Sequence, residues 1–133
     1  MPLRRRPGFE SPWYSANFVQ FVNFTVGPSV SHVVNVALAF LDPDGKGLKD
    51  SGGVFAYLSS DPAGLVLAAA PDSVAVGTNG LAIPLTAGLV WELVSSLAGL
   101  LDINITKAAG GTYYLNVVMP DGSILTSPVI TVT

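Results

Sequence analysis

The sequence predicts an all-β protein built as a sandwich or barrel. Glycine and proline together make up 24 of the 133 residues and fall at intervals along the whole chain, which is typical of many short strands joined by turns. Valine, isoleucine and threonine, which favour strands, number thirty, whereas lysine and glutamate, which favour solvated helices, number only three and two. Both observations favour strands over helices.

Alternation of apolar and polar residues marks the central strands. Residues 101–106 read Leu-Asp-Ile-Asn-Ile-Thr, which is the clearest inside-outside pattern in the chain. Residues 30–41 place valine, leucine and phenylalanine at the even positions, which predicts one continuous strand with one buried face. Residues 113–119 alternate again, and Pro120-Asp121-Gly122-Ser123 supplies a hairpin turn into a strand at 124–125.

Turn residues bound the remaining strands. We expect these strands at 17–25, 54–59, 74–76, 81–85, 89–94 and 129–132. The turns that separate them contain Asp, Asn, Pro and Gly: Asp42-Pro43-Asp44-Gly45, Asp61-Pro62-Ala63-Gly64, Asn79-Gly80 and Ala87-Gly88. A single helical turn is expected within 93–101. Eight or nine short strands with turns every 8 to 12 residues or so indicate a sandwich or barrel.

Charge is scarce and unevenly placed. Only 11% of the residues are charged, against roughly 25% in an ordinary soluble domain. At this length one domain is expected, which we place at residues 17–133, preceded by an extended arm over residues 1–16. The first ten residues hold three arginines and one glutamate, whereas the rest holds three lysines and eight acids. Outward strand positions carry Asn, Thr, Ser and Ala, so we expect a polar, nearly neutral exterior.

The side chains give little basis for catalysis or metal binding. Cysteine is absent, and the single histidine, His32, lies on the apolar face of its predicted strand as a core-edge residue. One histidine without a cysteine or a neighbouring acid makes neither a catalytic triad nor a zinc site. The sequence Asp42-Pro43-Asp44-Gly45-Lys46-Gly47 has aspartates two apart, as calcium loops do, but lacks their further acids, so it predicts a hairpin turn. We expect no enzyme activity, no metal and no cofactor.

The acidic side chains and the uncharged runs lead to the same expectation. A carboxylate pair for glycoside hydrolysis would come from Asp61, Asp72, Glu92, Asp102 and Asp121, three of which stand beside Pro or Gly in turns. Glu92 alternates out of phase with its apolar neighbours and is expected to face solvent. The long uncharged runs are interrupted by polar residues, glycine and proline, so we expect no membrane span.

Five residues of the arm form the candidate partner-binding site: Arg4, Arg5, Arg6, Trp13 and Tyr14. Burying Trp13 or Tyr14 removes roughly 150–250 Å² from water, whereas an arginine at an exposed rim contributes only about 0–1 kcal/mol. The aromatic residues are therefore expected to dominate docking on a protein. Alternatively, they fold back with Phe18 onto the chain's own sandwich. Binding to nucleic acid is not expected, because only three basic residues lie outside the arm.

The sequence Gly111-Thr112-Tyr113-Tyr114-Leu115 resembles the penultimate strand of immunoglobulin-like sandwiches. In that family the tyrosine hydroxyl bonds back to the backbone at a strand corner, and the residue two further on is buried against the opposite sheet. The resemblance assigns these roles to Tyr113 and Leu115. It departs from the family at Ala109, where an acid is usual, and in lacking cysteines. An ordinary strand tyrosine and another kind of β-sandwich remain the alternatives.

Residues 30–133 as a whole are similar to small structural proteins of tailed bacteriophages and prophages. Strand and turn segments carry the resemblance: 32–37, 42–46, 54–61, 80–83, 101–106, 111–115 and 120–123. It implies a non-enzymatic virion component with an immunoglobulin-like sandwich, first of all a head decoration or cement protein. Such a protein is made in the host cytoplasm and docks at the capsid surface.

The partners implied by this resemblance are the major capsid protein and copies of the chain itself, with no nucleic acid, membrane or small-molecule substrate. Two other classes stay open. One is a tail or head-to-tail connector component, present in few copies. The other is a glycan-binding surface module, in which exposed Trp or Tyr side chains would stack on sugars.

Overall fold

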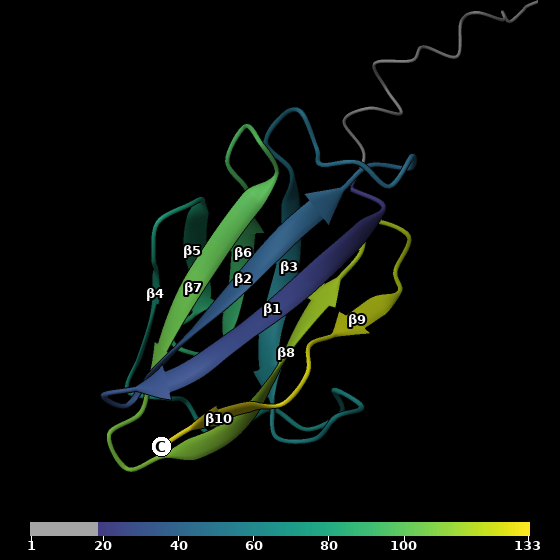
Figure 1. Cartoon of the computed structure of the whole chain (residues 1–133). Coiled ribbons are helices and arrows are strands. Elements are labelled where there is room, and N and C mark those ends of the chain that lie inside the picture. The colour runs from purple at the N-terminus through teal and green to yellow at the C-terminus, as the bar shows by residue number, and fades with distance from the viewer. Residues whose placement is uncertain (1–18) are drawn as a thin grey trace, which may run out of the picture.

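The computed structural model describes residues 19–133, which form ten strands and no helix (Figure 1). The strands are β1 (Phe21–Val30), β2 (Val33–Leu41), β3 (Gly53–Ser59), β4 (Ser73–Val76), β5 (Leu81–Thr86), β6 (Val90–Val94), β7 (Leu100–Thr106), β8 (Gly111–Val118), β9 (Ile124–Thr126) and β10 (Ile130–Val132). The predicted arm at 1–16 and the start of the strand predicted at 17–25 lie outside the described residues. The all-β prediction is confirmed.

The strands form two antiparallel sheets that pack face to face (Figure 1). The four-stranded sheet has the order β1-β2-β7-β4, and the six-stranded sheet has the order β10-β8-β3-β6-β5, with β9 also paired to β8. The helical turn predicted at 93–101 is wrong. There β6 ends at Val94, and a turn closed by the Gly99 amide donating to the Ser96 carbonyl, 3.0 Å away, leads into β7.

A single hydrophobic core fills the space between the sheets. Its largest fully buried side chains come from both sheets and from the loop before β3: Phe40, Leu38, Leu48, Leu58, Leu93, Leu101, Ile103, Ile105, Leu115 and Ile130. Fully burying one such aliphatic side chain contributes about 1.5–3 kcal/mol. The alternation read from residues 33–41 and 101–106 therefore sets the buried face of β2 and β7.

The continuous strand predicted at 30–41 is interrupted by a hairpin. Ser31 and His32 connect β1 to β2, and both have positive φ, 50° and 66°. A two-residue hairpin turn of type I′ requires positive φ at both positions, which Asn and Gly adopt most readily. Neither residue is of that kind, so this turn could not be predicted from the residue types. His32 is exposed in this turn, so its predicted place on the core-facing side of a strand is wrong.

The end of β1 is also tied to the C-terminal residue. The Ser29 hydroxyl donates to the Thr133 carbonyl at 3.1 Å and accepts from the Thr133 amide at 2.9 Å. Ser29 belongs to the four-stranded sheet, whereas Thr133 follows β10 of the six-stranded sheet. This contact joins the two sheets along one edge.

Candidate interaction face

Strand register gathers apolar side chains on the outer face of the six-stranded sheet. From β9 to β5, Ile124, Val118, Phe55, Glu92 and Ile83 lie opposite one another in a single row. The exposed fraction is 54% for Phe55, 48% for Ile124 and 41% for Ile83. A second row consists of Gly53, Val94 and Leu81, and so adds two apolar side chains. The apolar face, as we call this surface, consists of Phe55, Leu81, Ile83, Val94, Val118 and Ile124, with Glu92.

Glu92 is the only charge on the apolar face. Within residues 19–133, the only charged side chains that lie inside strands are Glu92 and Asp102. Glu92 is half-buried, in partial agreement with the prediction that it faces solvent. One of its carboxylate oxygens lies beside Gly53, where a Cβ would come within 3.3 Å. A shallow groove of about 290 Å³, lined by Gly53, Phe55, Glu92 and Val118 among others, lies on this part of the sheet.

The loop after β3 presents three further apolar side chains. Leu65 is 83% exposed, and Val66 and Leu67 are each more than half exposed. The Asp61 carboxylate accepts the backbone amides of Leu65 and Val66 at 3.0 and 2.9 Å. The hydrogen bonds from Val66 and Leu65 hold the pKa of Asp61 below its usual value. These hydrogen bonds give the loop a defined conformation in which its apolar side chains face solvent.

Polar contacts fasten this loop to the end of the apolar face. The Tyr57 hydroxyl donates to the Gly64 carbonyl at 2.7 Å. Beneath the loop, the fully buried Asn116 donates to the Ser59 hydroxyl at 2.9 Å and accepts from the Thr126 hydroxyl at 2.7 Å. Gly64 has a φ of +72°, and a Cβ there would come 2.7 Å from the Asn116 side-chain oxygen, so this position requires glycine.

The middle of the outer face of the four-stranded sheet has the opposite character. Register aligns Thr25, Ala37 and Asp102 in one row and Asn35 and Asn104 in another. The Asn35 side-chain amide donates to both Asp102 and Asn104 at 2.9 Å. These two rows, which we call the polar face, have the character that the sequence predicted for outward positions. Near the start of β1, the same outer surface also carries Phe21 and Leu100, which are 46% and 43% exposed.

The prediction of a polar exterior is wrong for the six-stranded sheet. The sequence contains a signal that reveals its apolar face. In residues 53–58 and 81–85, both alternating phases are largely apolar, which a strand with a solvated outer face does not require. Only the register brings these separate strands together, however, so the extent of the face is visible in the structure alone.

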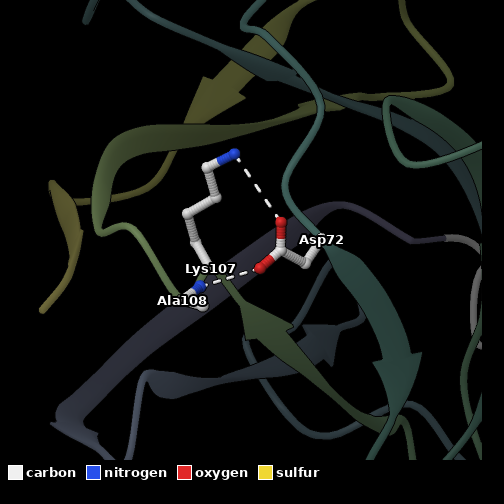
Figure 2. A network of polar contacts seen from close by, with 3 residues as sticks. All are labelled: Asp72, Lys107 and Ala108. Atoms are coloured by element: carbon white, nitrogen blue, oxygen red, sulfur yellow. Dashed lines mark hydrogen bonds and ion pairs between the residues drawn. The ribbon is translucent and has the colours of Figure 1, made fainter.

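The open edge between β4 and β5 holds a groove of about 450 Å³. Trp91 lines its floor but is only 2% exposed. At the rim, the Asp72 carboxylate lies 3.7 Å from the Lys107 ammonium and accepts the Ala108 amide at 2.8 Å (Figure 2). The ion pair is partly exposed and its two charges are 3.7 Å apart, so it contributes at most about 1 kcal/mol. Its role is to tie the segment before β4 to the turn between β7 and β8.

The Tyr113 hydroxyl does not make the backbone hydrogen bond that the immunoglobulin-like resemblance implies, as far as residues 19–133 show. The ring instead packs over Gly111, where a Cβ would come within 2.9 Å of the hydroxyl oxygen. Burial, and then the nearby Asp72 charge, raise the pKa of Tyr113. The other implied feature is present, because Leu115 is fully buried.

The remaining candidates are the partner-binding residues of the arm and the sequence that begins at Asp42. The predicted binding residues Arg4, Arg5, Arg6, Trp13 and Tyr14 all lie outside the described residues. The sequence starting at Asp42 is a turn, as predicted: its carboxylate accepts the amides of Asp44 and Lys46 at 2.9 and 3.0 Å. In the part of the chain that the structure describes, no group of three or more His, Asp or Glu side chains is placed to hold a metal ion.

The comparisons with known proteins add no relative. No protein-family model matches the chain, and no curated protein matches it with significant similarity. Over residues 19–133, no helix has the length and apolar character needed to cross a membrane. We therefore infer function from the surfaces of the molecule itself.

Proposed function

We propose that this chain is a non-enzymatic structural protein of a bacteriophage virion. On this proposal it decorates the capsid surface, docks on major capsid subunits and stabilises the head. The observation that carries the proposal is the apolar face, where Phe55, Ile83 and Ile124 stand exposed around one carboxylate. Single exposed apolar residues are common, but contiguous apolar patches mark contact with other molecules.

The area of the apolar face indicates that other parts of the chain must contribute to the docking surface. Five strands at about 4.8 Å spacing, with about three residues along each, measure roughly 20 by 10 Å. A stable protein interface covers about 800 Å² on each partner, so the apolar face alone is too small. The exposed loop with Leu65 extends it at one end. Trp13 and Tyr14 would add about 150–250 Å² each, which is why we keep the arm in the docking surface.

We also propose that the sandwich is immunoglobulin-like. The spatial orders β1-β2-β7-β4 and β10-β8-β3-β6-β5 correspond to the strand orders A-B-E-D and G-F-C-C′-C″ of variable-type immunoglobulin domains. The connectivity departs in two respects. The β5–β6 hairpin follows β4 along the chain and does not precede it, and within the hairpin the strand in the C″ position, β5, comes before the strand in the C′ position, β6. Leu115, fully buried in β8, supports the assignment.

The test is made on purified virions with and without the protein. We expect particles that lack it to lose resistance to heat and osmotic shock, and the purified wild-type protein to restore it. The variant Phe55→Asp, which places a charge on the apolar face, should not restore it. Thr25→Asp, on the polar face, is the matched control and should restore resistance fully. Equal resistance of the two kinds of particle would overturn the cement role.

Copy number and glycan binding separate the other two classes. Quantitative gel staining should find tens to hundreds of copies per particle for a decoration protein, and few for a tail or connector component. A glycan-binding module needs an exposed aromatic ring. Trp91 is buried, so such a module would depend on Trp13 or on tyrosines, and binding on a glycan array that Trp13→Ala abolishes would favour it.

A further inference from the structure

The chain enters the described structure beside the apolar face. Val19 is buried against Gly52, where a Cβ would come 2.6 Å from a Val19 methyl group. The next residue, Gly53, begins β3 and lines the groove that also contains Glu92. Residues 1–18 are therefore attached between the start of β1 and the start of β3, and the apolar face begins at the start of β3.

The length of this segment is sufficient to cover the face. At about 3.3 Å per residue, eighteen residues span up to roughly 60 Å, whereas the face is about 20 Å wide. Tyr14 is five residues from Val19 and reaches up to about 16 Å. The distance from β3 to β5 is two strand spacings, about 10 Å. The sequence Pro7-Gly8 favours turns, so it is compatible with a return of the arginines toward the same face.

The chemistry of the segment complements that of the face. Residues 1–18 contain Phe9, Trp13, Tyr14 and Phe18, and three arginines against one glutamate. The face offers apolar side chains around a single negative charge, Glu92. Two copies of the face packed about a twofold axis would instead bury two negative charges against apolar surface without a cationic partner, which is costly. The charge therefore favours the basic segment over a second copy of the face.

We propose that residues 1–18 fold back over the apolar face of their own chain while the protein is free. In this arrangement Trp13 and Tyr14 cover Phe55 and Ile83, and one arginine of the run at 4–6 pairs with Glu92. Docking on a partner then displaces the segment, which exposes the apolar face and the aromatic side chains of the segment at the same time. The proposal concerns the isolated protein, so it does not depend on a role in a virion.

Disulfide trapping in the full-length chain tests the proposal, and the absence of native cysteines makes the result unambiguous. The test pair is Tyr14→Cys with Ile83→Cys, and the matched control is Tyr14→Cys with Asn23→Cys. Asn23 is exposed on the opposite outer face, and at four residues, about 13 Å, from Val19 it lies within the same reach of Tyr14. In dilute protein under mild oxidation, we expect the test pair to form an intramolecular disulfide at least tenfold faster. Adding Glu92→Gln should slow it several-fold at low salt and have little effect at 1 M salt.

Equal rates for the two pairs would overturn the proposal, as would disulfide-linked dimers as the main product, since these place the segment on another copy. An unchanged rate with Glu92→Gln would overturn the arginine pairing. Acrylamide quenching of the unmodified chain gives a second measurement that needs no cysteine, with Trp13→Phe identifying the contribution of Trp13. We expect Trp13 to be several-fold less quenched than in a synthetic peptide of residues 9–18. Equal quenching would contradict the proposal.

Discussion

The side-chain amide of Asn35 on β2 donates a hydrogen bond to the Asp102 carboxylate on β7 at 2.9 Å. The same carboxylate accepts the backbone amides of Thr78 and Asn79 at 2.7–3.0 Å. Asp102 is consequently 8% exposed, although it belongs to the outer face of its sheet. The Asp102 carboxylate thus holds the turn between β4 and β5 against the polar face, so its negative charge has a structural role.

Stability should depend on the ionisation of Asp102. Burial by itself raises its pKa, but hydrogen bonds from Asn35, Asn79 and Thr78 outweigh burial and hold the pKa below its usual value. Because the folded-state pKa is lowered, this stabilisation is present above the unfolded pKa of about 3.9 and is lost as the pH falls through the folded-state pKa. We expect the free energy of unfolding, measured in urea from pH 6 to pH 2, to fall less steeply for Asp102→Asn than for the wild type. Parallel curves would contradict this.

The loop that presents Leu65 should loosen when its tyrosine contact is removed. Tyr57→Phe deletes the hydrogen bond to the Gly64 carbonyl, at a cost of about 0.5–1.5 kcal/mol. We expect the amides of Leu65 and Val66 to exchange with deuterium several-fold faster. Tyr114→Phe is the control on the same face, because its hydroxyl makes no hydrogen bond with residues 19–133. The prediction is wrong if both variants change exchange equally.

The strained hairpin between β1 and β2 offers a stabilising change. Ser31 and His32 both adopt positive φ, which suits Asn-Gly in a type I′ turn. The double variant Ser31→Asn, His32→Gly should raise the free energy of unfolding by about 1 kcal/mol by relieving backbone strain. Thermal melts measure this as a rise in Tm. A fall in Tm would show that the native side chains contribute more than the strain costs.

Two glycines with almost the same φ separate backbone strain from steric clash. Gly99 has φ +77° and Gly45 has φ +79°. A Cβ at Gly99 would come 2.9 Å from both the Phe40 carbonyl and the Leu48 amide, whereas at Gly45 nothing lies within 4 Å. Gly45→Ala should cost about 1 kcal/mol for its positive φ, and Gly99→Ala at least twice as much. Chemical denaturation of both variants measures the loss in free energy of unfolding. Equal losses would show that a steric clash at Gly99 contributes nothing.

The local pattern was sufficient to predict most strands and turns but not how they meet. Alternation in residues 101–106 and the turn at 120–123 were predicted correctly, because each is encoded within a few neighbouring residues. The Ser31–His32 turn was missed because its residues are not the ones that favour positive φ.

The candidate site was less accessible to sequence reasoning. Phe55, Glu92 and Ile83 are separated by up to 37 positions, and only the register of β3, β6 and β5 places them in one row. The burial of Asp102 likewise depends on a turn more than twenty residues away. Contacts of this range depend on strand order, which composition and periodicity do not specify.

The contact between Ser29 and Thr133 has a practical consequence for labelling the molecule. It holds the last residue near the end of β1, and β1 is ten residues long, so Thr133 lies about 30 Å along the strand direction from the point where the chain enters at Val19. Figure 1 shows the C-terminus at the opposite end of the sandwich from the start of β1. A fluorescent protein or epitope tag fused after Thr133 should therefore lie at the opposite end of the sandwich from Val19 and leave the attachment point of residues 1–18 unobstructed.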